Sequence, residues 1–438
     1  MNELTGKMEC GAGRPMMEWS RLISDKRFGM EDYHDRRGGS RSDFQRDFDR
    51  LVFSSPFRRL QNKTQVFPLP GSVFVHNRLT HSMEVSCVGR SMANEISSAL
   101  KPRYAGTPHE KALDSIGEIV AAACLAHDLG NPPFGHSGEK AISTFFSEGA
   151  GADLRNELTP AQWADLVHFE GNANAFRLLT HQFNGRRQGG FAMTYSMLAS
   201  IVKYPFSSTL AGDRNKFGFF SSERESFRRI ADELGIIVTT DTPDASSYAR
   251  HPLVYVVEAA DDICYEVMDI EDAHKLKILS TDEVKRLFLN FFSDERRARC
   301  EDVMARIADP NEQIGYLRSG VIGLLVSRCA EAFVEHEQEI LAGRFHGSLL
   351  ACRLVRKGPM SSATRCRGRR SIAHLTLSTS SWPVTASSPF CSKSSSTLCA
   401  TPTSTIRGCC SRRCRSNMMS TPRSFSPKSS RCSIMSRA

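Results

Sequence analysis

The sequence lacks long hydrophobic runs. No apolar stretch approaches the roughly 20 residues that a membrane-spanning helix needs, and no apolar export segment follows Met1. Convincing strand alternation is also missing, apart from short candidates at Gln65–Val75 and Ile236–Thr240. We therefore expect a cytoplasmic, all-α protein with at most a short β-hairpin and without a membrane partner.

Acidic residues are missing from one end of the chain. Residues 348–438 contain 16 Lys and Arg, 23 Ser and no Asp or Glu. The formal net charge of +9 for all 438 residues comes from this end, because residues 1–347 carry 41 basic against 48 acidic groups, a net of −7. The body of the chain therefore does not have the basic charge that is typical of a nucleic-acid-binding domain.

Three segments are predicted from these patterns. The apolar residues of segment 1–39 show only weak periodicity, which predicts a flexible N-terminal arm. Residues 40–347 are predicted to form a helical core. Residues 348–438 form a tail that is typical of out-of-frame translation or, alternatively, of a disordered basic arm. Its cysteines, including the adjacent Cys409 and Cys410, have neither zinc-site nor disulfide spacing, so we assign no functional site to it.

Four residues in predicted helices have the side chains of a divalent metal site: His81, His127, Asp128 and Asp261. The adjacent pair closes an Ala-rich apolar run, residues 116–130, so it lies at a helix end from which both side chains can reach one ion. A buried structural histidine is the simpler alternative, but a carboxylate at a helix C-terminus requires a compensating cation. Two imidazoles and two carboxylates suit Mn, Fe, Co, Zn or Mg.

The other two metal candidates come from separate helices. His81 lies in the first turn of a helix that begins near Thr80, and Asp261 lies in a helix for which Pro252 fits the first position. On that second helix Asp261 shares a face with a phenol and another carboxylate, whereas Asp262 points elsewhere. Asp262 is therefore the second choice of ligand.

A histidine and a glutamate follow the metal candidates closely. His136 and Glu139 are three positions apart at the start of the next predicted helix, after the rigid loop Asn131–Gly135. Histidine titrates near neutral pH, and a carboxylate orients it, so the pair suits proton transfer beside metal-activated water. A surface His–Glu pair would be the simpler interpretation without the metal candidates nine residues upstream.

A series of motifs resembles one known family in order and content. The motifs are Arg58–Phe67, His76–Ser82, His127–Glu139, Phe169–Asn172, Lys203–Pro205 and Glu258–Ile263. Over roughly residues 40–347 they closely resemble the bacterial deoxyguanosine triphosphate triphosphohydrolases of the HD-domain superfamily. The resemblance implies an HD-domain helical bundle and hydrolysis of a deoxynucleoside triphosphate, dGTP first, to deoxynucleoside and tripolyphosphate. It also implies that His136 and Glu139 are the catalytic pair.

The resemblance implies a substrate pocket as well. The matching positions are Gln65, Arg78, Lys203, Tyr204, Tyr265 and Asp269. Arg78 and Lys203 would bind the polyphosphate. Asp269 would accept a bond from the 3′-hydroxyl, and Tyr265 would crowd the place of a 2′-hydroxyl and reject ribonucleotides. Glycine-containing stretches at residues 183–190 and 207–222 are expected to frame the pocket mouth.

The family resemblance also predicts a cofactor and partners. It implies a divalent metal (Mg, Mn, Fe or Co), single-stranded DNA as an effector and a homo-oligomer, often a hexamer. One alternative is an impaired or inactive module that binds nucleotide or single-stranded DNA, in case helices that the family carries beyond residue 347 are lost. Another alternative is an HD phosphodiesterase that acts on a different nucleotide.

Overall fold

The computed structural model describes residues 15–31, 41–65, 75–185, 188–212 and 215–354. All of them belong to one compact unit, residues 1–375. Its helices are α1 (Trp19–Leu22), α2 (Asp43–Val52), α3 (Ser55–Arg59), α4 (Arg78–Leu100), α5 (Pro108–Leu113), α6 (Ile116–Ala126), α7 (His136–Ser147), α8 (Pro160–Val167), α9 (Gly171–Thr180), α10 (Tyr195–Ile201), α11 (Arg224–Leu234), α12 (Pro252–Lys275), α13 (Thr281–Leu289), α14 (Asp294–Met304), α15 (Pro310–Leu341) and α16 (Leu349–Leu354). The expected all-α fold is confirmed.

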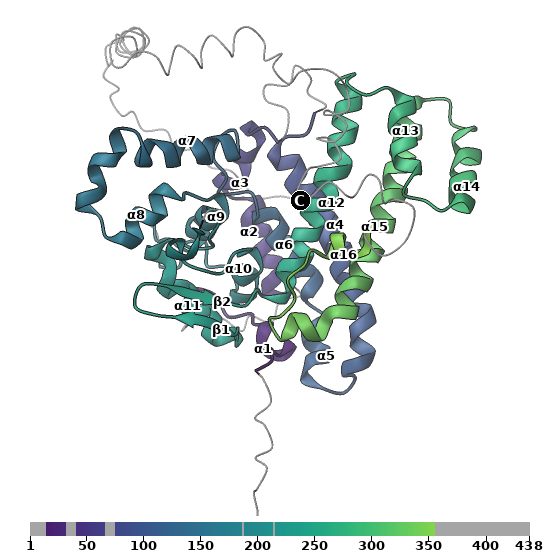
Figure 1. Ribbon diagram of the computed structural model, residues 1–438. Helices are drawn as coiled ribbons and strands as arrows, with labels where there is room; N and C mark the ends of the chain where they lie inside the picture. Colours follow the sequence, from purple (N-terminus) through teal and green to yellow (C-terminus); the bar gives the residue numbers. More distant parts are fainter. Residues whose placement is uncertain (1–14, 32–40, 66–74, 186–187, 213–214, 355–438) are drawn as a thin grey trace, which may run out of the picture. The chain divides into compact units, whose positions relative to one another are not determined.

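Helix α6 lies at the centre of this unit, and α2, α4, α10 and α12 pack around it (Figure 1). Its residues are all buried except Glu118, which is consistent with its Ala-rich sequence. Small residues bring the helices close together. A Cβ added at Gly89 of α4 would meet the Cys124 sulfur of α6 at 2.7 Å. The backbones of α4, α6 and α12 are therefore packed closely, and this brings the metal candidates of α4, of α12 and of the end of α6 near one another.

Local sequence signals set several helix starts. Ser42 caps α2, and Ser280 forms a capping box with Glu283 at the start of α13, as the sequence predicts. Pro252 occupies the first position of α12. Helix α4 begins at Arg78, two residues before Thr80, because Asn77 is the cap and Thr80 completes a capping box with it.

One short antiparallel hairpin is present, formed by β1 (Val238–Asp241) and β2 (Ser246–Tyr248). This agrees with the strand candidate at Ile236–Thr240. The other candidate, Gln65–Val75, falls mostly outside the described residues, although a single bridge joins Thr64 to Asn77. Among the described helices, none combines the length and the apolar character of a membrane span.

The expectation of a flexible arm over residues 1–39 is wrong for residues 15–31. Trp19 and Leu22 of α1 are buried in the core, and the Trp19 indole donates to the Glu337 carboxylate at 2.9 Å. The Met17 amide also donates to the Leu341 carbonyl at 2.9 Å. Its few apolar side chains reach the core, but the segment is too short for their spacing to show a helical periodicity in the sequence.

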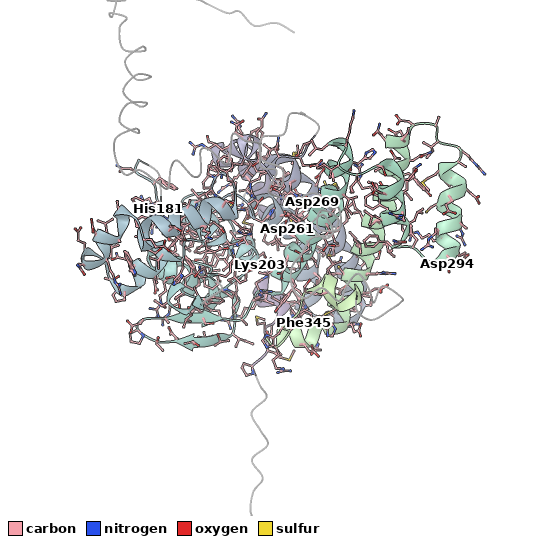
Figure 2. All side chains as sticks on the ribbon, turned by 45° about the horizontal axis from the view of Figure 1, so that its top comes forward. His181, Lys203, Asp261, Asp269, Asp294 and Phe345 are labelled. Carbon is pink, nitrogen blue, oxygen red and sulfur yellow. The ribbon has the colours of Figure 1, made fainter. Side chains whose placement is uncertain are left out.

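The predicted boundary at residue 348 also needs correction. Helix α16 packs on α12 and α15, and Leu349 and Leu350 are 1% and 5% exposed. Phe345, labelled in Figure 2, lies just before α16. Its ring meets that of Tyr255 of α12 edge to face, with the ring centroids 5.2 Å apart. The packed body thus continues to α16, and the rest of the predicted tail lies outside the described residues.

Candidate functional site

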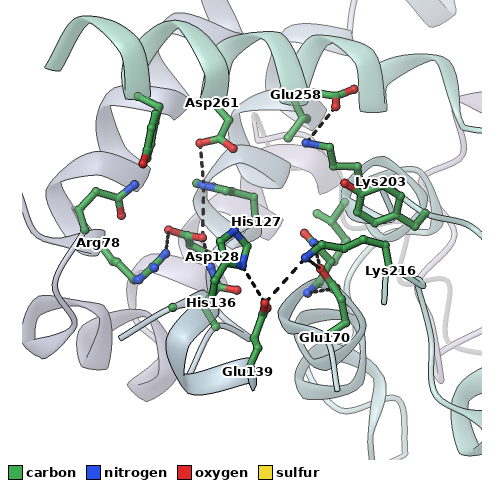
Figure 3. A pocket seen from close by; sticks show the side chains of 18 of the residues that line it. Arg78, His127, Asp128, His136, Glu139, Glu170, Lys203, Lys216, Glu258 and Asp261 are labelled. Carbon is green, nitrogen blue, oxygen red and sulfur yellow. Dashed lines mark hydrogen bonds and ion pairs between the residues drawn. The ribbon is translucent and has the colours of Figure 1, made fainter. Parts of the chain in front are cut away.

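The structure brings the four metal candidates together. The candidate ligand atoms of His81, His127 and Asp128 all lie within 4.8 Å of one another. Asp261 Oδ1 lies 3.4 Å from His127 Nε2 (Figure 3). The same oxygen lies 3.0 Å from His81 Nε2, whereas Asp262 makes no contact with either imidazole among the described contacts. His81 comes from the first turn of α4, and Asp261 comes from the middle of α12. Helix α6 ends at Ala126, so His127 is its C-cap and Asp128 follows the helix.

The orientation of His127 fits a metal ligand. Its Nδ1 lies 2.6 Å from the Cys124 carbonyl oxygen. Because a carbonyl only accepts, Nδ1 must carry a proton, and Nε2 is the nitrogen left to bind a cation or a second proton. His127 Nε2 is buried and has no hydrogen-bond partner among the described residues. Burying a polar nitrogen without a hydrogen bond costs free energy of folding. A cation or a proton between His127 Nε2 and the two carboxylates that it faces would remove this cost.

Charges within the cluster attract one another strongly. Burial disfavours ionisation of Asp261, but the imidazoles of His127 and His81 outweigh it and hold the pKa of this carboxyl well below its usual range. Burial likewise disfavours a charged His127, yet Asp128 and Asp261 raise the pKa of its imidazole to about 9. The carboxylates are therefore ionised at neutral pH, as metal ligands must be.

Asp128 is held by two donors besides its histidine neighbours. Arg78 donates to Oδ2 at 2.5 Å, and the Asn131 side-chain amide donates to Oδ1 at 2.5 Å. Gly135 permits the approach of Arg78, because its φ is 54° and a Cβ there would meet the guanidinium at 2.7 Å. Both oxygens of Asp128 thus have fixed directions before any ligand binds.

His136 and Glu139 form the second part of the site. His136 begins α7, and its Nδ1 lies 2.8 Å from Glu139 Oε2. The other oxygen, Oε1, accepts the Gly171 amide proton at 2.8 Å. Burial disfavours the charge on Glu139, but the bond from His136 and the Lys216 ammonium lower the pKa of this carboxyl. An ionised Glu139 makes Nδ1 the donor and leaves Nε2 of His136 directed away from it.

One cavity of about 400 Å³ contains both parts of the site. Its wall includes His127, Asp128 and Asp261 from the metal cluster together with His136 and Glu139 (Figure 3). This volume lies within the usual range of small-molecule pockets. A bound molecule would therefore contact both the metal cluster and the His–Glu pair.

Comparison with known proteins agrees with this arrangement. The HD domain family matches residues 78–187. A deoxyguanosinetriphosphate triphosphohydrolase-like protein of Pseudomonas aeruginosa is 40% identical over 76% of this chain and 74% of its own length. Another from Synechocystis sp. is 40% identical over 76% of each chain. The deoxyguanosinetriphosphate triphosphohydrolase of Yersinia enterocolitica is 33% identical over 71% of this chain and 69% of its own length.

The chain belongs to the deoxyguanosinetriphosphate triphosphohydrolase family. The family resemblance of the sequence motifs is therefore confirmed. The matched HD domain begins at Arg78 and so contains His81, the adjacent His127–Asp128 pair and His136. Asp261 lies outside the matched range, and α12 supplies it from a distant part of the sequence.

Most of the substrate residues expected for the family line the cavity. They are Gln65, Arg78, Lys203, Tyr204 and Tyr265. Lys203 pairs with Glu258 at 2.9 Å, and this carboxylate keeps the pKa of the ammonium above its usual value despite burial. Asp269 is the exception, because it is 3% exposed and does not line the cavity. It lies one turn beyond Tyr265 on α12, and its Oδ2 has no hydrogen-bond partner among the described residues.

Sequence reasoning missed several residues of the cavity wall. Lys216 lies 2.8 Å from Glu170 and 3.8 Å from Glu139, so it bridges two carboxylates. Nothing local distinguishes Lys216 in the sequence, apart from its place in the stretch 207–222 that was expected to frame the mouth. Glu170 and Asn172 belong to the Phe169–Asn172 motif, which signals family membership without indicating a contact.

Proposed function

We propose that this chain hydrolyses deoxynucleoside triphosphates, with dGTP as the leading substrate, to deoxynucleoside and tripolyphosphate. The observation that carries the proposal is one cavity whose wall includes three of the four metal candidates, His127, Asp128 and Asp261, together with an oriented His–Glu pair. Membership of the HD-domain triphosphohydrolase family supports the same reaction class.

His81, His127, Asp128 and Asp261 would hold one divalent metal, taken from Mg, Mn, Fe and Co. When bound, such a metal supplies charge neutralisation on the phosphate and activation of water for attack. The imidazoles and carboxylates of this set match the ligand preferences of these ions. The buried Nε2 of His127, which has no hydrogen-bond partner among the described residues, supports the assignment to this residue in particular.

His136 would move protons during the reaction. Hydrolysis at the α-phosphorus forms a bond from water oxygen to phosphorus and breaks the bond to O5′. The water loses one proton and the departing O5′ gains one, so a group near neutral pKa can serve as carrier. Glu139 holds Nδ1 of His136 at 2.8 Å, which stabilises the imidazolium when His136 carries the proton.

Three cations around the cavity support a polyphosphate substrate. Arg78, Lys203 and Lys216 all line it. Each is paired with a carboxylate, namely Asp128, Glu258 and Glu170, and Lys216 also lies 3.8 Å from Glu139. The pairing holds the long side chains in place before the substrate arrives, which reduces the entropy that binding would otherwise cost. A triphosphate offers enough anionic oxygens to contact all three cations at once.

Two further residues of the cavity wall support selection of a deoxyribose. Tyr265 and Gln65 line the cavity, and Gln65 Oε1 is buried without a partner among the described residues. We propose that Gln65 accepts a hydrogen bond from the sugar, and that the Tyr265 ring occupies the space of a 2′-hydroxyl. Asp269 is buried outside the cavity wall, so its expected bond to the 3′-hydroxyl has no support from this geometry. Single-stranded DNA as an effector and a homo-oligomer remain predictions from family membership.

Product analysis tests the proposed reaction. The chain is incubated with dGTP and Mn²⁺ in ¹⁸O-labelled water, and phosphorus NMR and mass spectrometry follow the products. We expect tripolyphosphate as the first phosphorus product, with ¹⁸O in the tripolyphosphate and none in the deoxyguanosine. Orthophosphate or pyrophosphate as the first product, or label in the deoxyguanosine, would contradict attack at the α-phosphorus. Nucleotide binding without turnover would favour the alternative of an inactive binding module.

A further inference from the structure

Asn131 connects the metal cluster to the neighbouring loop. Its side-chain amide donates to Asp128 Oδ1 at 2.5 Å, which fixes the direction of the carboxylate oxygen that faces His127. Its backbone is itself held in place, because the Asn131 carbonyl accepts a hydrogen bond from the Lys63 ammonium at 2.6 Å. Partners of this kind orient a metal ligand without touching the ion.

The first residue of α9 packs directly against Asn131 and Glu139. The Gly171 amide donates to Glu139 Oε1 at 2.8 Å. A Cβ at this position would lie 1.9 Å from Asn131 Oδ1 and 2.9 Å from Glu139 Oε1. Only a residue without a side chain leaves both of these atoms where they are, so glycine is required here by contact rather than by backbone conformation.

The preceding residue fixes the start of α9. Glu170 is fully buried, and its Oε2 accepts the backbone amides of Asn172 and Ala173 at 2.6 and 3.2 Å. Its Oε1 accepts from the Asn172 side chain at 2.7 Å and from Lys216 at 2.8 Å. Because both carboxylate oxygens of Glu170 accept these hydrogen bonds, the start of α9 cannot shift without losing charge-assisted hydrogen bonds.

We infer that Asn131 is a positioning residue for the metal ligand Asp128, and that Gly171 at the start of α9 holds Asn131 in its working orientation. The start of α9 then supports both parts of the site, since the Gly171 amide also donates a hydrogen bond to Glu139. This gives the Phe169–Asn172 motif a physical role. The inference rests on the proposed function only in that the cluster binds a divalent metal.

Mn²⁺ affinity, measured by calorimetry without nucleotide, tests the inference. Asn131→Ala should weaken Mn²⁺ binding by about 10- to 100-fold, because Asp128 loses its orienting donor. Asn131→Leu, which keeps the volume and removes the donor, should weaken it to a similar extent. Gly171→Ala should weaken binding by about tenfold, because the new methyl group displaces the Asn131 side chain.

The combination of the two changes is the decisive measurement. In an Asn131→Ala background the clash with Oδ1 no longer exists, so Gly171→Ala should weaken Mn²⁺ binding by less than about threefold more. Gly323→Ala is the matched control, because a Cβ there meets nothing within 4 Å, and it should leave the affinity unchanged. Thermal unfolding in EDTA checks that each variant folds.

Two results would overturn the inference. Wild-type Mn²⁺ affinity in folded Asn131→Ala and Asn131→Leu would show that Asn131 does not position Asp128. An equal loss from Gly171→Ala in both backgrounds would show that Gly171 acts without Asn131. Failure of the proposed hydrolysis is distinguishable, because the affinities are measured without nucleotide and do not depend on turnover.

Discussion

The two parts of the site differ in their exposure to solvent. The side chains of His81, Asp128 and Asp261 are 2%, 8% and 32% exposed, whereas that of His136 is 87% exposed. The metal cluster lies between the packed helices α4, α6 and α12, but His136 begins a helix at the edge of the cavity. Metal ligands can be fixed in the core, whereas a proton carrier must remain accessible to the substrate.

This difference separates binding of the metal from the chemistry. Loss of a buried ligand should change both metal affinity and turnover. Loss of the exposed histidine should change turnover alone, since no metal candidate depends on it for orientation among the described contacts. The following variants test the two parts separately.

Asp261→Ala should have the largest effect. Removing this ligand leaves two imidazoles without the carboxylate that they face at 3.0 and 3.4 Å. We expect Mn²⁺ affinity and steady-state dGTP turnover each to fall by about 100-fold or more. Asp262→Ala is the control and should retain metal binding. If metal and activity survive in Asp261→Ala and are lost in Asp262→Ala, the ligand is Asp262.

His136→Asn should reduce turnover and leave metal binding intact. General acid–base catalysis contributes about 10²- to 10⁴-fold, so kcat should fall within this range. Mn²⁺ affinity, measured by calorimetry, should remain within about twofold of wild type, because His136 contacts none of the metal candidates among the described contacts. His181→Asn is the matched control, since His181 faces Glu223 and does not line the cavity. A parallel loss of metal affinity would mean that the two parts are coupled.

Asp269→Asn should stabilise the protein increasingly as the pH rises from about 4 to about 8. Burial raises the pKa of Asp269 from 3.8 to about 8, and Asp272 adds to the shift. A raised carboxyl pKa contributes stability that is fully present below the unfolded-state pKa and is lost as the pH rises through the folded-state value. Asn mimics the neutral acid, so the melting temperature at pH 8 should exceed that of wild type by a few degrees.

The same two proteins should melt at similar temperatures near pH 4, where wild-type Asp269 is protonated in the folded state. Thermal unfolding by circular dichroism over this pH range is the measurement. A constant difference at every pH would show that the effect is not a titration of Asp269. It would then reflect packing at α12 instead.

Truncation should have the smallest effect on either part of the site. A chain that ends at residue 354 should keep the wild-type Mn²⁺ affinity and melting temperature. A chain that ends at residue 347 should keep the affinity but lose stability, because Leu349 and Leu350 contribute about 1.5–3 kcal/mol each when buried. Equal stability of the 347- and 354-residue chains would show that α16 does not support the core.

The sequence predicted the parts of the site that depend on local pattern. Residue types and helix positions predicted that His81, His127 and Asp128 would lie together, and their ligand atoms do lie close to one another. The three-residue spacing of His136 and Glu139 predicted that they would share a helix face, and the two side chains are in contact. The choice of Asp261 over Asp262 agrees with the contacts to both imidazoles. The boundaries at residues 39 and 348 were less reliable, since α1 and α16 are too short to produce a periodic signal.

By itself, the sequence determined the helical class, the family and the chemical types of the site, because periodicity, caps and motif order are local properties. Only the tertiary structure decided which residues complete the cavity. Lys216 reaches Glu170 across 46 positions, and Gly171 reaches Glu139 across 32. Such contacts depend on how closely two backbones approach, and that distance is set by packing of the whole core rather than by neighbouring residues.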